Sequence, residues 1–111
     1  MINFKDKKIL ITGATGGIGK ALVKKFVTLE GHVLATGTKT EKLNALKEEF
    51  PNINILKFDI SDHSKIEEFI ENTSSQLAGL DVLVNNAGIN MDNLSLRMKD
   101  EEWKKVIDVN L

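Results

Sequence analysis

Short, mostly apolar runs alternate along this chain with longer segments in which apolar residues recur every three or four positions. Four runs have the length of a strand, and they cover residues 9–11, 33–36, 53–58 and 80–84. The first run, residues 9–11, is apolar throughout, which predicts a strand that is buried on both faces and is typical of parallel sheets. The spacing in the longer segments predicts helices that bury one side.

Caps, breakers and apolar stripes mark these predicted helices. The stripe of the first helix, residues 17–29, is expected to consist of Ile18, Leu22, Phe26 and Leu29. Thr40 is the predicted N-cap of the second helix, and Pro51 ends it. A third helix is expected between the third and fourth apolar runs. A last helix is predicted with Asp100 as its cap and with Asn110 in line with its apolar stripe.

The alternation of strands and helices predicts an α/β fold in which right-handed crossovers join parallel strands. We expect a Rossmann-type, doubly wound parallel sheet with the strand order 3-2-1-4. All of residues 1–111 are assigned to one dinucleotide-binding domain. The sheet is expected to be truncated after about four strands, because no fifth apolar run follows the last predicted helix.

Composition narrows the classes of function that suit the chain. The net charge is −1 and like charges form no block, which argues against binding to nucleic acid or to a membrane surface. Cysteine is absent and the two histidines lack metal-ligand spacing, so neither a disulfide nor a metal site is expected. The first residues contain no apolar stretch of signal-peptide length, and a cytosolic location is predicted.

A glycine-rich turn joins the first predicted strand to the first predicted helix. Its candidate site residues are Gly13, Ala14, Thr15, Gly16, Gly17, Ile18 and Gly19. A helix N-terminus offers free backbone N–H groups and the positive end of a dipole, and glycines let a pyrophosphate approach them. The turn therefore predicts dinucleotide binding. Its spacing fits both T-G-x-x-x-G-x-G and T-G-x-x-G-x-x-G, and by itself it does not choose between these motifs.

The end of the second apolar run indicates which dinucleotide is bound. NAD sites usually place an acid there, beside the ribose 2′-hydroxyl. Residues 35–39 contain no carboxylate, and the first acid is Glu41. Thr38 and Lys39 instead offer a hydroxyl and a cation, which suit a 2′-phosphate. The sequence thus favours NADP over NAD as the cofactor.

The fourth apolar run ends in a second motif, Asn-Asn-Ala-Gly at residues 85–88. With the glycine turn, this motif makes the chain resemble the classical short-chain dehydrogenase/reductases rather than the extended relatives that act on sugar nucleotides. Residues 88–103 contain the run D-N-L-x-x-R-M-K-D-E-E-W, which strongly resembles bacterial 3-oxoacyl-(acyl-carrier-protein) reductases. The resemblance covers the whole chain but only about the front half of such an enzyme.

This resemblance implies roles for further residues. Those implied to line the adenine and ribose side of the pocket are Asp59, Ile60, Asn86, Ala87 and Gly88. Asn110 belongs to a segment similar to the family's N-x-N-L motif, and it is implied to act in catalysis by holding a water of the proton relay. Gly16 departs from the pattern, because many of these reductases carry there an Arg that helps to grip the 2′-phosphate.

The resemblance also implies a reaction. An NADPH-dependent reductase of this kind transfers hydride to a β-ketoacyl thioester on acyl carrier protein, in fatty-acid synthesis, and forms a homotetramer. Its proton donor is the Tyr of a Tyr-x-x-x-Lys pair assisted by a Ser, but this chain contains no tyrosine. We therefore expect an inactive N-terminal fragment of a longer enzyme. The alternatives are a non-catalytic dinucleotide-binding or interaction module and a short-chain dehydrogenase of another substrate class.

Overall fold

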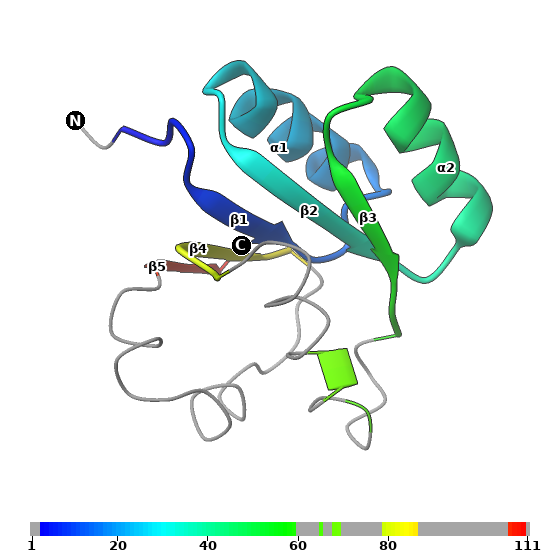
Figure 1. The fold of residues 1–111 in the computed structure, drawn as a ribbon. Coiled ribbons are helices and arrows are strands. Elements are labelled where there is room, and N and C mark those ends of the chain that lie inside the picture. The colour runs from blue at the N-terminus through cyan, green and yellow to red at the C-terminus, as the bar shows by residue number, and fades with distance from the viewer. Residues whose placement is uncertain (1–2, 60–64, 66–67, 70–78, 87–106, 111) are drawn as a thin grey trace.

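A computed structural model describes residues 3–59, 65, 68, 69, 79–86 and 107–110 of the chain. Within these residues, five parallel strands form one sheet in the order β3-β2-β1-β4-β5 (Figure 1). The elements in chain order are β1 (Lys8–Ile11), α1 (Gly17–Thr28), β2 (His32–Gly37), α2 (Thr40–Glu49), β3 (Asn54–Lys57), β4 (Val82–Asn85) and β5 (Ile107–Asn110). The Rossmann-type class and the predicted order of the first four strands are confirmed.

The central strand β1 is buried on both of its faces. Leu10 lies opposite Leu34 of β2 and opposite Leu83 of β4, and all three leucines are buried. Ile9 and Ile11, whose side chains point to the other face of a pleated strand, are also fully buried. The continuous apolarity of this run is thus explained by burial on two sides.

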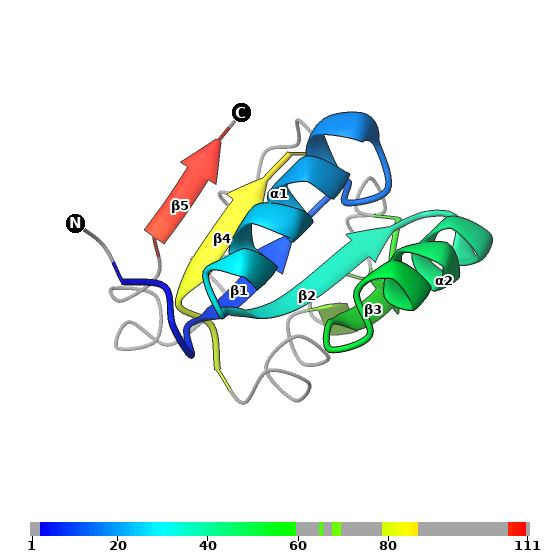
Figure 2. The ribbon, with the colours of Figure 1, turned by 90° about the horizontal axis from the view of Figure 1, so that it is seen from above.

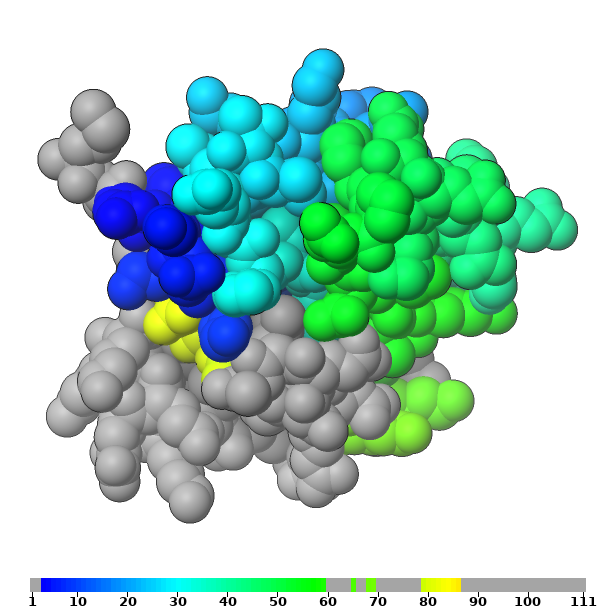
Figure 3. All heavy atoms as spheres, turned by 45° about the horizontal axis from the view of Figure 1, so that its top comes forward, coloured from blue at the N-terminus to red at the C-terminus, as the bar shows by residue number. Residues whose placement is uncertain are grey.

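Both described helices lie on the same face of the sheet (Figure 1, Figure 2). The first, α1, packs against β1 and β2, whereas α2 packs against β2 and β3. The buried cluster between the helices and the sheet consists of Ile9, Ile11, Ala14, Val23, Val33, Ala35, Leu46, Ile53, Val82 and Val84. In the space-filling view, the atoms from β1 through β3 form one continuous surface (Figure 3).

The starts of both helices differ from the prediction. Ile18 was expected in the buried stripe of α1, but it is 67% exposed, and Gly19 and Val23 are buried instead. Since consecutive residues of a helix point about 100° apart, turning Gly19 toward the sheet leaves Ile18 facing outward. Thr40 was expected to cap α2, but it is already helical and the N-cap is Lys39.

The sheet extends beyond the four strands that the sequence predicted. Residues 107–110 were expected in a helix, yet they form β5, in which Ile107 lies opposite Val82 and Asn110 opposite Asn85. The sequence Ile-Asp-Val-Asn alternates apolar and polar residues, which is the period of a strand. The helix prediction for these residues was therefore wrong, and a fifth strand follows the four that were expected.

Candidate dinucleotide-binding site

The glycine turn lies at the carboxyl edge of the sheet, between the end of β1 and the start of α1 (Figure 2). From β1 the chain adds β2 and β3 on one side, and then β4 and β5 on the other side. The turn is therefore at the point where the strand order reverses. In open α/β sheets, ligands bind in the crevice outside the carboxyl ends of the strands at such a point.

Two positions in the turn require glycine. Gly13 has a φ of 61°, in the left-handed region that residues with a Cβ rarely adopt. A Cβ on Gly19 would lie 2.2 Å from the carbonyl oxygen of Gly13 and 2.7 Å from the Cα of Ala14. The absence of that Cβ lets the first turn of α1 rest directly on the backbone of the glycine turn.

Hydrogen bonds to both neighbouring strands hold the turn in place. The N–H of Ala14 donates to the carbonyl of Thr36 in β2 at 2.9 Å, and the N–H of Thr12 donates to a carbonyl of β4 at 3.0 Å. The side-chain amide of Asn86, through Nδ2, donates to the carbonyl oxygen of Gly13 at 3.0 Å. The structure thus brings the predicted site residue Asn86 against the glycine turn.

Buried polar groups under the turn were missed as site residues by the sequence analysis. Thr12 is 1% exposed and Asn85 is 3% exposed. The Thr12 hydroxyl lies 3.3 Å from Oδ1 of Asn85 and 3.4 Å from the carbonyl oxygen of Val84, so its one proton has two acceptors. The hydroxyl of Thr36 donates to the carbonyl of Ile11 at 3.3 Å. A buried polar side chain at the end of a strand needs a hydrogen-bond partner. The polar residues that end these apolar runs could therefore have been predicted from the sequence to pair with one another.

The start of α1 is open toward solvent and fits a pyrophosphate. Its N-cap, Gly16, has no side chain that could cap the first N–H groups of the helix. A Cβ on Gly17 would meet no described atom within 4 Å. Free N–H donors, a positive dipole end and bare glycine backbone are the features that bind phosphate at helix N-termini. The residues present therefore fit the diphosphate of a dinucleotide.

The end of β2 lies next to the same turn. A Cβ on Gly37 would lie 3.2 Å from Cγ2 of Thr15, so the Thr15 side chain covers this glycine. Thr38 and Lys39 follow it and are exposed, as is Asp59 after β3. Their accessibility suits the predicted contacts with the ribose and the adenine, and those contacts stay predictions.

The remaining predicted site residues are less well defined by the structure. Ile60, Ala87 and Gly88 lie outside the described residues. Asn110 lies in β5 rather than in a helix, opposite Asn85 at the carboxyl end of β4. Its backbone is therefore at the same edge of the sheet as the glycine turn. Its catalytic role stays a prediction.

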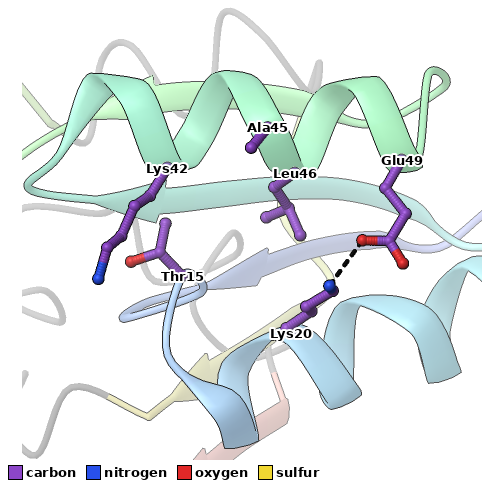
Figure 4. Close-up of a pocket in the computed structure, with 6 residues that line it drawn as sticks. All are labelled: Thr15, Lys20, Lys42, Ala45, Leu46 and Glu49. Atoms are coloured by element: carbon purple, nitrogen blue, oxygen red, sulfur yellow. Dashed lines mark ion pairs between the residues drawn. The ribbon is translucent and has the colours of Figure 1, made fainter.

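A groove between α1 and α2 was not foreseen from the sequence. It has a volume of about 180 Å³, and its lining residues are Thr15, Lys20, Lys42, Ala45, Leu46 and Glu49 (Figure 4). Lys20 of α1 and Glu49 of α2 form an ion pair across it, with 2.7 Å between Nζ and Oε2. The groove escaped the sequence analysis because its walls come from separate segments that only the packing of the two helices brings together.

The strand order and the glycine turn at its reversal point define the chain as a Rossmann-type α/β protein. The family model for short chain dehydrogenases matches residues 7–111, and the chain belongs to this family. The resemblance inferred from the sequence is thereby confirmed. Among the described residues, no helix has the length and apolarity needed to cross a membrane.

Matches to individual proteins are consistent with the match to the family model. The 3-oxoacyl-[acyl-carrier-protein] reductase FabG of Escherichia coli is 38% identical over 111 residues, which cover 99% of this chain and 46% of the relative. FabG of Rickettsia conorii is 44% identical over 112 residues, covering 100% and 45%. A crystal structure of a short-chain dehydrogenase from Streptomyces avermitilis matches with a TM-score of 0.69 at 32% identity, over 76% of this chain and 31% of that protein. The chain spans about half the length of the curated relatives.

Proposed function

We propose that this chain is the N-terminal, dinucleotide-binding part of an NADPH-dependent 3-oxoacyl-(acyl-carrier-protein) reductase of fatty-acid synthesis. The parent enzyme would reduce a β-ketoacyl thioester carried by acyl carrier protein. The observation that carries the proposal is the uncapped start of α1 behind a glycine turn that β2 and β4 hold in place. The names and the 38–44% identity of the FabG relatives supply the substrate class.

The described residues would bind and orient the cofactor. The N–H groups of Gly17 and Ile18, at the positive end of α1, would bind the pyrophosphate. Gly13 and Gly19 would let the start of α1 pack closely on the glycine turn. When bound, the nicotinamide supplies the hydride. Asn110 would take part in catalysis by holding a water of the proton relay.

We further propose NADP rather than NAD as the cofactor. The end of β2 offers the exposed residues Thr38 and Lys39 and no carboxylate before Glu41. A 2′-phosphate is attracted by a cation and repelled by an acid. Gly16 lacks the guanidinium found in many relatives, so a cation elsewhere must contribute more.

The remaining parts of the reaction belong to the parent enzyme. The family's Ser, Tyr and Lys would come from its other half, since this chain has no tyrosine. A homotetramer and docking of acyl carrier protein are proposed on the strength of the family alone. A cytosolic location, like the lack of nucleic-acid and membrane binding, stays a prediction from the sequence.

The test is an assay of the parent enzyme with acetoacetyl thioesters, following the oxidation of NADPH and of NADH. We expect turnover with NADPH and weaker use of NADH at the same ionic strength. Turnover of sugars or steroids only would refute the substrate class. Dinucleotide binding without any carbonyl reduction would instead favour a non-catalytic module.

A matched pair of variants tests the pyrophosphate site. Gly17→Asp places a carboxylate where the pyrophosphate is expected, although an acid suits the first turn of a helix and should not impair folding. Ala21→Asp makes the same charge change one turn later, at another exposed position of α1. We expect dinucleotide binding to be lost in Gly17→Asp and kept in Ala21→Asp. Equal affinities in both variants would exclude the start of α1 as the site.

A further inference from the structure

The groove between α1 and α2 ends at the glycine turn. Thr15 lines one end of it, and the same side chain covers Gly37 at the carboxyl end of β2. In Rossmann-type sheets the ribose that carries the adenine lies beside the end of the second strand. A group on the 2′ position of that ribose would therefore lie near the mouth of the groove.

The two lysines of the groove differ in their partners. Lys20 forms an ion pair with Glu49, with 2.7 Å between Nζ and Oε2. Lys42 makes no ion pair or hydrogen bond with any other part of the chain that the structure describes. Figure 4 shows its side chain extending along the Thr15 end of the groove, whereas Lys20 reaches toward Glu49. Among the described residues, Lys20 is therefore paired and Lys42 has no charged partner.

Lys39, the cation that the sequence analysis selected, does not line this groove. It is the N-cap of α2 and is exposed, and Lys42 lies one turn later on the same helix. Apolar side chains of Ala45 and Leu46 form part of the groove beyond Lys42. They leave Lys42 and Thr15 as the polar groups at the end nearest the glycine turn.

We propose that Lys42 and the hydroxyl of Thr15 bind the 2′-phosphate of NADP, and that Lys42 is the main residue that distinguishes NADP from NAD. This assignment rests on the proposed function and deepens it. A phosphate could pair with Lys42 without displacing any partner among the described residues, whereas at Lys20 it would compete with Glu49. Lys42 thus supplies the cation that Gly16 does not.

The test compares two small nucleotides that differ only in the 2′-phosphate. Calorimetric titration of the parent enzyme with 2′,5′-ADP and with 5′-AMP gives the ratio of their dissociation constants. The wild type should bind 2′,5′-ADP about 10-fold or more tightly, the size expected for one charge-assisted hydrogen bond. We expect Lys42→Gln to lose most of this ratio and Lys42→Arg to retain it, because arginine keeps the charge.

Two further variants separate the possible outcomes. Lys20→Gln removes the same charge from the same groove and should leave the ratio unchanged. If Lys39→Gln lowers the ratio as much as Lys42→Gln or more, the assignment to Lys42 is wrong while the NADP proposal stands. If the wild-type enzyme binds the two nucleotides equally, the NADP proposal itself fails. Binding of 5′-AMP by each variant shows that the site has folded.

Discussion

Replacing Gly19 with alanine sets two effects of opposite sign against each other. Alanine in place of glycine favours the helix by up to about 1 kcal/mol. Its Cβ, however, would lie 2.2 Å from the carbonyl oxygen of Gly13. An ordinary contact between two non-bonded atoms is about 3.5 Å. The next nearest atoms, Cα and C of Ala14 at 2.7 and 2.9 Å, are backbone as well, so no rotamer change can relieve the overlap.

The backbone that would have to move is itself restrained. The N–H of Ala14 is bonded to Thr36, and the carbonyl of Gly13 accepts from Asn86. Overpacking of this kind costs about 1–3 kcal/mol and sometimes more. After subtracting the gain in helix propensity, we expect Gly19→Ala to lower the free energy of unfolding by up to about 2 kcal/mol.

Gly17→Ala is the matched control for this prediction. It lies two residues earlier in the same helix, and its Cβ would meet no described atom within 4 Å. We expect its stability to be unchanged or raised by up to about 1 kcal/mol. Urea unfolding of the chain, followed by far-ultraviolet circular dichroism, measures both variants. The reasoning is refuted if Gly19→Ala proves as stable as Gly17→Ala.

Three further predictions concern the turn and the chemistry. Thr12→Val keeps the side-chain shape but removes the hydroxyl near Asn85. Urea unfolding should show that the free energy of unfolding falls by about 1 kcal/mol. Unchanged stability would mean that this hydrogen bond contributes nothing. Asn86→Ala removes the bond to Gly13, so calorimetry should show weaker 5′-AMP binding by about 5-fold; wild-type affinity would show that the turn needs no such support. The chain alone should not reduce acetoacetyl thioesters in a spectrophotometric assay, and measurable turnover would require a proton donor other than tyrosine.

The first four strands were predictable because each lies in a mostly apolar segment between clear breaks. Their order was predictable because the alternation of strands and helices indicates a doubly wound sheet. Residues 107–110 were not, since four residues are too few to separate two periods. Ile107 and Asn110 are three apart, which suits a helical stripe, while Ile-Asp-Val-Asn alternates like a strand. In the structure these residues form a strand because they pair with β4. The local pattern of apolar residues contains no information about that partner strand.

The candidate site, too, could be predicted from the sequence only in part. The glycine turn was predictable because all of its residues are adjacent in the sequence and its chemistry is local. The contact between Thr12 and Asn85 joins residues 73 positions apart, and the groove beside Lys42 exists only once α1 and α2 have packed. Ile18 was misassigned for the same reason. The periodicity of apolar residues cannot show that Gly19 packs against the backbone of the glycine turn.

These contacts imply that the proposed pyrophosphate site and the proposed selectivity for NADP depend on the fold to different degrees. Gly13 and Gly19 touch each other in a turn that is bonded to β2 and β4, so a change there disturbs folding and binding together. Lys42 is exposed and makes no polar contact within the described part of the chain, so a change there can alter the affinity for a 2′-phosphate without disturbing the core. Additivity holds for substitutions without shared partners. Combining Lys42→Gln with Gly19→Ala should therefore leave the stability loss of Gly19→Ala unchanged.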